Sequence, residues 1–393
     1  MEEDEVLDLL TSLADKNLVA ADPIDGDSRF RLVETVRQYA REKLLEDAGG
    51  EAVRERHLGH FVSLAEEAEP RLQEADQATW LSRLEQEHDN LRAALEWSLV
   101  STAMDPGLRL CGALQRFWIT RGHYAEGRKW CARVLEAARA EAPALARAKA
   151  LNCAGLLAYH QVDYAAARTQ HEASLVIRRQ LGDRRSVAVS LNNLGLVALD
   201  QGDLDSARSL HEESLAIARE LGNRNGVARS LGNLGMVASE QHDFAAARAL
   251  FEECRALMRE LGDREGTAIS LHSLGGVAYE QGDYDAACAH YRESLAILRE
   301  LGHRGRIAYS LEELAAVFAA LGRVRHAARL CGAAQRLREE VGAPAPSEDS
   351  AFAARIAAAR KALGDDADFD RAWQEGRGLT LEQALELGSA SPR

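Results

Sequence analysis

Residues 261–287 read LGDREGTAISLHSLGGVAYEQGDYDAA, and nearly the same words recur elsewhere in the chain. The Leu-Gly pair that opens this stretch begins at residues 181, 221, 261 and 301, each 40 residues after the previous copy. A second marker, an apolar residue in the second half of each copy, keeps the same spacing at Tyr124, Tyr164, Leu204, Phe244, Tyr284 and Val324. Self-similarity at a fixed period of this length predicts an array of stacked structural repeats.

Each repeat has the apolar spacing of two helices. In one copy the first stripe is Val187, Leu191, Leu194 and Val197, and the second is Leu204, Ala207, Leu210 and Leu215. Both stripes fit the helical period of 3.6 residues. The Gln-Gly-Asp turn at 201–203 offers a glycine to end the first helix and an aspartate to accept hydrogen bonds from the start of the second. We therefore predict one helical hairpin per repeat, with Leu-Gly-Asp or Leu-Gly-Asn between repeats.

Glycine recurs in the middle of the first helix, at residues 155, 195, 235 and 275. Since glycine costs a helix about 1 kcal/mol relative to alanine, another group must press against the backbone there. Small residues of the second helix would let the two helices approach closely: Ala167, Ala207, Ala247 and Ala287. His171 and His211 stand where later copies have Phe251 and Tyr291, so we expect both histidines to be packing residues.

The composition excludes several classes of function. The chain has 393 residues and a formal net charge of -14, which argues against gripping nucleic acid over a broad face. No apolar run is long enough to span a membrane, and the acidic N-terminus does not resemble a signal peptide, so we expect a cytoplasmic protein. Six cysteines without CxxC pairing predict reduced, small core residues: Cys111, Cys131, Cys153, Cys254, Cys288 and Cys331.

The repeats resemble a known family. The stretch LNNLGLVALDQGDLDSARSLHEESLAIA, residues 191–218, is similar to a tetratricopeptide repeat in its Leu-Gly pair, its turn and its small residues Ala207 and Ser214. The spacing is 40 residues where the ordinary repeat has roughly 34, as in the long variants of some adaptor proteins. The resemblance implies an all-α, right-handed superhelix of 40-residue hairpins. The outer copies are weaker, with Gln115 where the glycine should be, as expected of capping repeats.

The segment before the repeats resembles a different unit. Residues 6–44 predict a helix, a strand at 17–22, a turn at 25–27, a strand at 29–33 and a helix, which is similar to the winged-helix tail that follows the ATPase module in bacterial regulators of the signal-transducing STAND class. Residues 80–99, 116–130 and 369–387 resemble that family's linker, first hairpin and C-terminal cap.

This resemblance gives four expected parts. They are a partial winged-helix unit at 1–48, a helical linker at 49–104, about six repeat hairpins at 105–342, and a helical C-terminal cap and tail at 343–393.

Several functional motifs are missing from the sequence. It holds no GxxxxGK[ST] phosphate loop, so we expect no ATP binding and no cofactor. Nor does it hold a GxSxG nucleophile elbow, and we do not expect an enzyme, although a hydrolase hidden in the cap region is a remote alternative. No helix-turn-helix follows residue 388, so transcriptional control would lie upstream or in a partner. The chain would then be the C-terminal half of a larger regulator or a short natural relative.

Two weaker candidates have simpler explanations. His57 and His60 lie three residues apart on an expected helix, but no third metal ligand has suitable spacing, which favours a solvated pair. A basic cluster could touch DNA through the wing and consists of Arg29, Arg31, Arg37, Arg41 and Lys43. In the family, however, this unit mainly packs against the ATPase. Direct nucleic-acid binding is therefore not expected.

The resemblance implies a ligand groove lined by the first helix of each hairpin. Carrying the family's concave positions onto this sequence selects the candidate contacts Asn152, Tyr159, Asn192, Asn193, Asp200, Asn233, Glu240, His272, Tyr279 and Glu280. Asparagine donates and accepts at once, which suits an extended peptide backbone, and the acidic residues favour a basic ligand. The alternatives are amides that cap or solvate the helix and acids of an ordinary solvated face.

We thus expect a scaffold that binds a protein or an extended peptide. The family suggests the sensor or regulatory arm of a bacterial signalling ATPase or transcriptional regulator, with the ATPase module upstream or in a partner. The rival hypothesis is a free-standing adaptor that joins two proteins.

Overall fold

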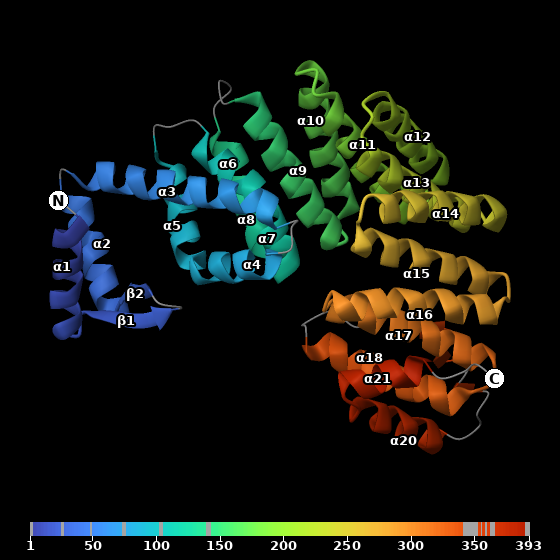
Figure 1. Cartoon of the computed structure of the whole chain (residues 1–393). Helices are drawn as coiled ribbons and strands as arrows, with labels where there is room; N and C mark the ends of the chain where they lie inside the picture. Colours follow the sequence, from blue (N-terminus) through green and yellow to red (C-terminus); the bar gives the residue numbers. More distant parts are fainter. Residues whose placement is uncertain are drawn as a thin grey trace. The chain divides into compact units, whose positions relative to one another are not determined.

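The computed structural model divides into two compact units, Met1–Asp163 and Tyr164–Arg393. Figure 1 shows the helices and strands of the whole chain. The residues that the structure describes are 3–24, 27–47, 49–72, 76–101, 105–138, 143–340, 353–354, 356–357, 360–361 and 366–389.

The first unit opens with a helix, a two-stranded sheet and a helix: α1 (Glu3–Asp15), β1 (Val19–Ile24), β2 (Asp27–Leu32) and α2 (Glu34–Glu46). The strands pair antiparallel, with Val19 opposite Leu32. This order confirms the prediction, but the first strand begins two residues late because Asn17 adopts a left-handed conformation, with φ 55°, as it ends α1. Residues 25 and 26 of the expected turn lie outside the described residues, and residue 27 already belongs to β2.

The rest of the first unit is helical: α3 (Gly50–Arg71), α4 (Gln77–Gln86), α5 (His88–Ser98), α6 (Pro106–Ala113), α7 (Gln115–Arg121), α8 (Tyr124–Ala137) and α9 (Ala144–His160). One hydrophobic core joins them, and Leu58, Leu91 and Trp118 are among its fully buried members. The helix expected before the first repeated turn is divided at Leu114 into α6 and α7.

The second unit is an array of helices that each have 17 residues: α10 (Tyr164–Gln180), α11 (Arg184–Asp200), α12 (Leu204–Glu220), α13 (Arg224–Glu240), α14 (Phe244–Glu260), α15 (Arg264–Glu280), α16 (Tyr284–Glu300), α17 (Arg304–Ala320) and α18 (Val324–Glu340). Consecutive helices pack against each other along the chain (Figure 1). The predicted 40-residue helical hairpins are thus confirmed from α11 to α18.

The turns between helices use the residues that the sequence offers for them. Gly202 leaves α11 with φ 77°, in the left-handed region where glycine is favoured. Asp203 then accepts a hydrogen bond on Oδ1 from the backbone N–H of Ser206, 3.1 Å away, and so caps α12. His242 takes the place of the glycine in the next hairpin and has φ 59°, a conformation that is strained for most side chains.

The recurrent glycines make room for a ring of the second helix. A Cβ added to Gly235 would lie 2.6 Å from Phe251, and one added to Gly275 would lie 2.7 Å from Tyr291. Gly195 faces His211 in the same way, and His211 is fully buried. For Gly195, Gly235 and Gly275, the expectation that a group presses on the helix backbone is therefore confirmed, and so is the expectation that His211 is a packing residue.

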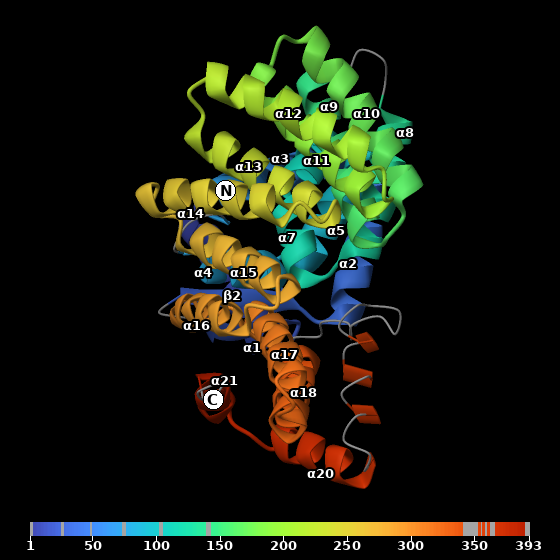
Figure 2. The same cartoon turned by 90° about the vertical axis from the view of Figure 1, so that its right-hand side faces the viewer.

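Two further helices, α20 (Asp366–Arg377) and α21 (Leu381–Ser389), cap the array by packing on α18 (Figure 2). The helices α18 and α20 cross closely at two glycines, since a Cβ on Gly332 or on Gly376 would collide with the opposite backbone. Trp373 donates a hydrogen bond from Nε1 to Gln335 Oε1 at 2.7 Å. The helical cap is thus confirmed.

All six cysteines are buried, as expected of core residues.

Candidate functional site

The exposed face of the first helices carries a repeated set of residues. In α11 the set is Asn193, Leu196 and Asp200, which fall at i, i+3 and i+7 and so share one side of the helix. The equivalent residues are Asn233, Met236 and Glu240 in α13, and Ser273, Gly276 and Glu280 in α15. The three acids are exposed, and the other six residues are half-buried. We call these nine residues the first-helix face.

The acids of this face stand where the helix disfavours them. Asp200, Glu240 and Glu280 are the last residues of α11, α13 and α15. A helix C-terminus carries partial negative charge, so an acid there costs about 0.3–1 kcal/mol. Tyr164 hydrogen bonds to Asp200, and the pKa of Tyr164 is raised by burial and by that carboxylate.

Asn192 lies behind the face, in a buried polar network. Its Oδ1 accepts from Nδ1 of His211 at 2.9 Å, and its Nδ2 donates to Ser230 Oγ at 3.1 Å. Ser230 in turn donates to Ser214 Oγ at 3.1 Å. Burial lowers the pKa of His211 to about 4, which keeps the imidazole neutral. The network joins α11 and α12 to α13, so Asn192 connects two hairpins in this structure.

Asn233 links the network to the face. Its Nδ2 lies 3.4 Å from Asn192 Oδ1, and its side chain is half-buried. Asn193 is half-buried as well. The structure therefore places the candidate amides at two depths, with Asn192 buried and the other two partly accessible.

His272 and Tyr279 lie on α15 among other aromatic residues. The ring of His272 stacks on Tyr309 with centroids 4.7 Å apart, and Nδ1 of His272 lies 3.3 Å from Ser310 Oγ. Burial, with a smaller effect from Arg306, lowers the pKa of His272 to about 4. Tyr279 packs against Tyr284 with centroids 5.6 Å apart.

Asn152 and Tyr159 belong to the first unit, on α9. Asn152 is buried and donates from Nδ2 to Gln115 Oε1 at 3.0 Å. Tyr159 is half-buried, with its ring 5.7 Å from that of His160.

Several polar groups of the array are buried in contacts that the sequence did not predict. Glu312 on α17 is buried and accepts two hydrogen bonds of 2.6 Å from Arg338 on α18, which is itself largely buried. Arg178 is also buried and donates to Ser190 Oγ at 2.8 Å. The sequence held a signal for buried polar groups in the array, because serine recurs every 40 residues. All four of these serines are buried: Ser190, Ser230, Ser270 and Ser310.

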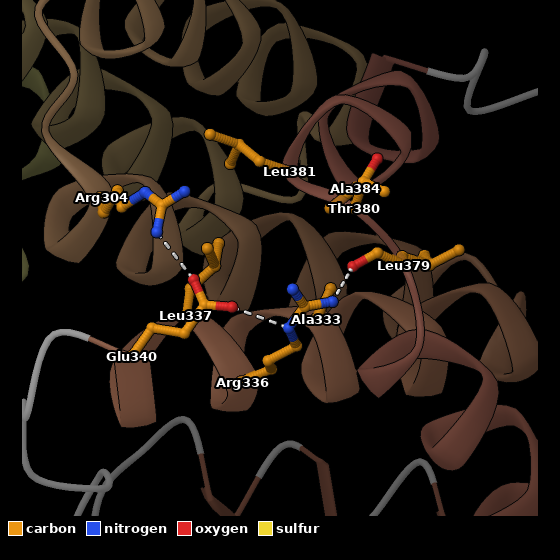
Figure 3. A pocket seen from close by; sticks show the side chains of 9 residues that line it. All are labelled: Arg304, Ala333, Arg336, Leu337, Glu340, Leu379, Thr380, Leu381 and Ala384. Carbon is orange, nitrogen blue, oxygen red and sulfur yellow. Dashed lines mark hydrogen bonds and ion pairs between the residues drawn. The ribbon is translucent and has the colours of Figure 1, made fainter.

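A small pocket lies between the last hairpin and the cap (Figure 3). Glu340 accepts hydrogen bonds there from Arg304 at 2.9 Å and from Arg336 at 2.8 Å. Arg336 also donates to the carbonyl of Leu379. The pocket holds about 20 Å³, room for a water molecule but not for a larger ligand.

The other candidates of the N-terminal half have local partners. Arg41 lies 2.8 Å from Glu96, Lys43 lies 2.6 Å from Glu46, and Arg37 lies 2.6 Å from Glu34, so much of the basic cluster is paired with acids. His57 and His60 both pack against Phe61, with centroids 4.6 and 5.0 Å away.

No helix within the described residues combines the length and the apolar character that a membrane span requires.

These features define the class of protein: a solenoid of helical hairpins whose sequence fits the tetratricopeptide repeat. Four overlapping matches to that family cover residues 146–220, 186–260, 226–300 and 266–340. This part of the chain belongs to the tetratricopeptide-repeat family, whose arrays are protein-binding scaffolds.

The curated relatives are similar over a shorter stretch. Two proteins provisionally named HTH-type transcriptional regulators, from Mycobacterium bovis and Mycobacterium tuberculosis, are each 43% identical over 131 residues, or 33% of this chain. The chain matches about 15% of the length of these relatives.

Solved structures share the fold at low sequence identity. A Rap protein complexed with competence and sporulation factor has a TM-score of 0.56 at 14% identity, covering 86% of this chain and 88% of its own. A STAND protein with a tetratricopeptide-repeat sensor from Pyrococcus horikoshii has a TM-score of 0.50 at 13% identity, covering 96% of this chain and 59% of its own. At this identity both likenesses show the fold alone.

Proposed function

We propose that the repeat array binds a protein or an extended peptide with basic residues along the first-helix face. The observation that carries the proposal is the row of exposed acids, Asp200, Glu240 and Glu280, at the ends of α11, α13 and α15, where a negative charge is unfavourable. Lysine or arginine side chains of a ligand would offset its cost.

The half-buried amides supply the second element of this site. Asn193 and Asn233 lie two helical turns before the acids on the same side of α11 and α13, and each amide can donate and accept. An extended backbone could therefore bond to the amides while its basic side chains reach the acids. Tyr279 would add an aromatic surface near the acid of α15.

The buried candidates have a supporting part in this proposal. Asn192 fixes the position of Asn233 through the network, and His272 sits against Tyr309 and Ser310 beside the face. On α9 of the first unit, Asn152 and Tyr159 stand at the equivalent positions and are proposed as contacts there.

We further propose that the chain acts as the regulatory arm of a bacterial signalling ATPase or transcriptional regulator. The relation to proteins named as transcriptional regulators and the fold shared with a STAND protein support this role. The Rap neighbour shows that a similar fold holds a second molecule. In this role the chain is cytoplasmic, non-catalytic and free of cofactors, and an ATPase module acts with it in cis or in trans.

The proposed parts are those expected from the sequence: a partial winged-helix unit at 1–48, a linker at 49–104, repeats at 105–342, and a cap and tail at 343–393. A free-standing adaptor is the alternative. The gene separates the two roles, since a phosphate-loop motif encoded upstream in the same reading frame supports the arm, whereas a stop codon and an independent start support the adaptor.

Selection from a random peptide display library on the purified chain tests the binding proposal. We expect the recovered peptides to be enriched in lysine and arginine. A parallel selection on the triple variant Asp200→Asn, Glu240→Gln and Glu280→Gln should lose that enrichment. Recovered peptides without basic residues, or the same peptides from both proteins, would contradict the proposed site.

A further inference from the structure

We propose that Glu85, His88 and His123 of the first unit form a binding site for a divalent transition metal of the zinc type. Glu85 lies on α4, His88 is the first residue of α5, and His123 directly precedes α8. The three side chains offer one carboxylate and two imidazole nitrogens, a donor set that suits zinc and does not suit magnesium or calcium.

The distances fit a shared metal. His123 Nε2 lies 3.4 Å from Glu85 Oε2, and His88 Nδ1 lies 3.7 Å from Glu85 Oε1. The three ligand atoms all lie within 4.8 Å of one another. Two ligands at about 2.0–2.1 Å from a tetrahedral zinc are about 3.4 Å apart, so small side-chain movements would close the site.

The hydrogen bonds of His88 leave one of its nitrogens aimed at the site. Arg92 donates to both carboxylate oxygens of Glu126, at 2.7 and 2.6 Å, so Glu126 is an ionised acceptor. His88 Nε2 lies 3.1 Å from Glu126 and must therefore carry the proton that it donates. The lone pair of neutral His88 is then on Nδ1, which faces Glu85.

Two acceptors that face each other repel unless a cation lies between them. His88 is only 9% exposed, and its Nδ1 lies beyond hydrogen-bond range of the Glu85 carboxylate. A metal ion would satisfy both groups. An imidazole that donates its second N–H to a carboxylate is the usual arrangement of a metal-bound histidine, with Glu126 as the outer partner here.

The surroundings hold both rings in place and leave solvent access. Phe117 packs edge-on against His88 at 5.3 Å, and the rings of His88 and His123 are 4.5 Å apart. Glu85 is partly exposed, which leaves room for water as a fourth ligand. Arg121 Nε lies 3.5 Å from Glu85 Oε2 and would have to give way when the metal binds.

Calorimetric titration of the full chain with zinc chloride, after treatment with a chelator, tests the site. We expect one zinc ion per chain and an increase in melting temperature, because the ion would bind the folded state preferentially. The variants His123→Gln and Glu85→Gln should each weaken binding at least tenfold, and Glu126→Gln should weaken it about tenfold. The first two change partly exposed residues, so folding should persist, and circular dichroism checks it.

The double variant His57→Gln, His60→Gln is the matched control, because it also removes two neighbouring histidines of the first unit. It should bind zinc as the wild type does. No zinc binding by the wild-type chain would overturn the proposal and would assign the cluster to a protonated His88 between two carboxylates. Zinc binding that survives His123→Gln and Glu85→Gln would overturn it as well, by placing the metal elsewhere.

Discussion

Substituting Gly275 by alanine tests how the hairpins pack. The added Cβ would lie 2.7, 2.9 and 2.9 Å from three ring atoms of Tyr291. Tyr291 is fully buried, its hydroxyl lies 3.4 Å from Glu313 Oε2, and its ring packs against His272 at 5.1 Å, so the ring has little room to retreat. Overpacking of this kind costs about 1–3 kcal/mol.

Helix propensity acts in the opposite direction. Alanine is favoured over glycine in a helix interior by about 1 kcal/mol. Because the clash involves a buried ring and not the end of a flexible chain, we expect it to outweigh the propensity gain, with a net loss of up to about 2 kcal/mol.

The neighbouring residue supplies a matched control. A Cβ on Gly276 would lie 3.7 Å from the Tyr291 hydroxyl, an ordinary van der Waals contact. Gly276→Ala should therefore stabilise the protein by up to about 1 kcal/mol. The two variants have the same composition and differ by one position in α15.

Urea unfolding followed by circular dichroism at 222 nm measures both variants. Repeat arrays need not unfold in two states, so the midpoints are compared before any free energies. The Gly275→Ala midpoint should fall below the wild type and the Gly276→Ala midpoint should rise above it. If both midpoints rise by a similar amount, the ring does not fill the glycine position and the packing account is wrong.

Three further predictions concern the buried polar groups. Both ring nitrogens of His171 are buried without a hydrogen-bond partner among the described residues. The variant His171→Phe should therefore be more stable than the wild type by about 1–3 kcal/mol. Burial also lowers the pKa of His171 to about 4 in the folded protein, so the imidazole of the unfolded chain becomes protonated first as the pH falls. The stability of the wild type should therefore decrease between about pH 6.5 and pH 4, and the loss at pH 5 should be about 2 kcal/mol. The Phe variant should lose that part of the decline in thermal melts. Asn192→Ala should lower the free energy of unfolding by about 1–3 kcal/mol, and Asn193→Ala should lower it clearly less. Equal losses would mean that the buried network of Asn192 does not stabilise the fold. Glu312→Gln should cost about 3 kcal/mol because it removes the carboxylate that faces a largely buried arginine, whereas Glu265→Gln, in a more exposed pair, should change stability by less than about 1 kcal/mol; similar losses would refute this contrast.

Local chemistry made the repeats predictable. The Gly202 and Asp203 turn acts through backbone conformation and capping within a few residues, so the sequence alone indicated where α11 ends and α12 begins. The first strand was misplaced by two residues because the left-handed conformation of Asn17 depends on how α1 ends.

The depth of the candidate site residues was not predictable in the same way. Asn192 is buried because the next hairpin brings Ser230 onto it from 38 residues away, and a helical period does not reveal such a contact. The cluster of Glu85, His88 and His123 also escaped notice, since its members come from three helical segments without a recognised spacing.

The affinity of a selected basic peptide is the most direct test of the first-helix face. Fluorescence anisotropy would compare the wild type with the triple variant Asp200→Asn, Glu240→Gln and Glu280→Gln. The control triple, Glu172→Gln, Glu212→Gln and Glu252→Gln, removes three exposed acids with the same 40-residue spacing from the second helices, so the net charge changes equally.

At about 0.5 kcal/mol for each exposed ion pair, the face variant should bind about tenfold more weakly and the control should bind like the wild type. Equal affinities for all three proteins, or equal losses in both triple variants, would contradict the claim that this face binds the ligand.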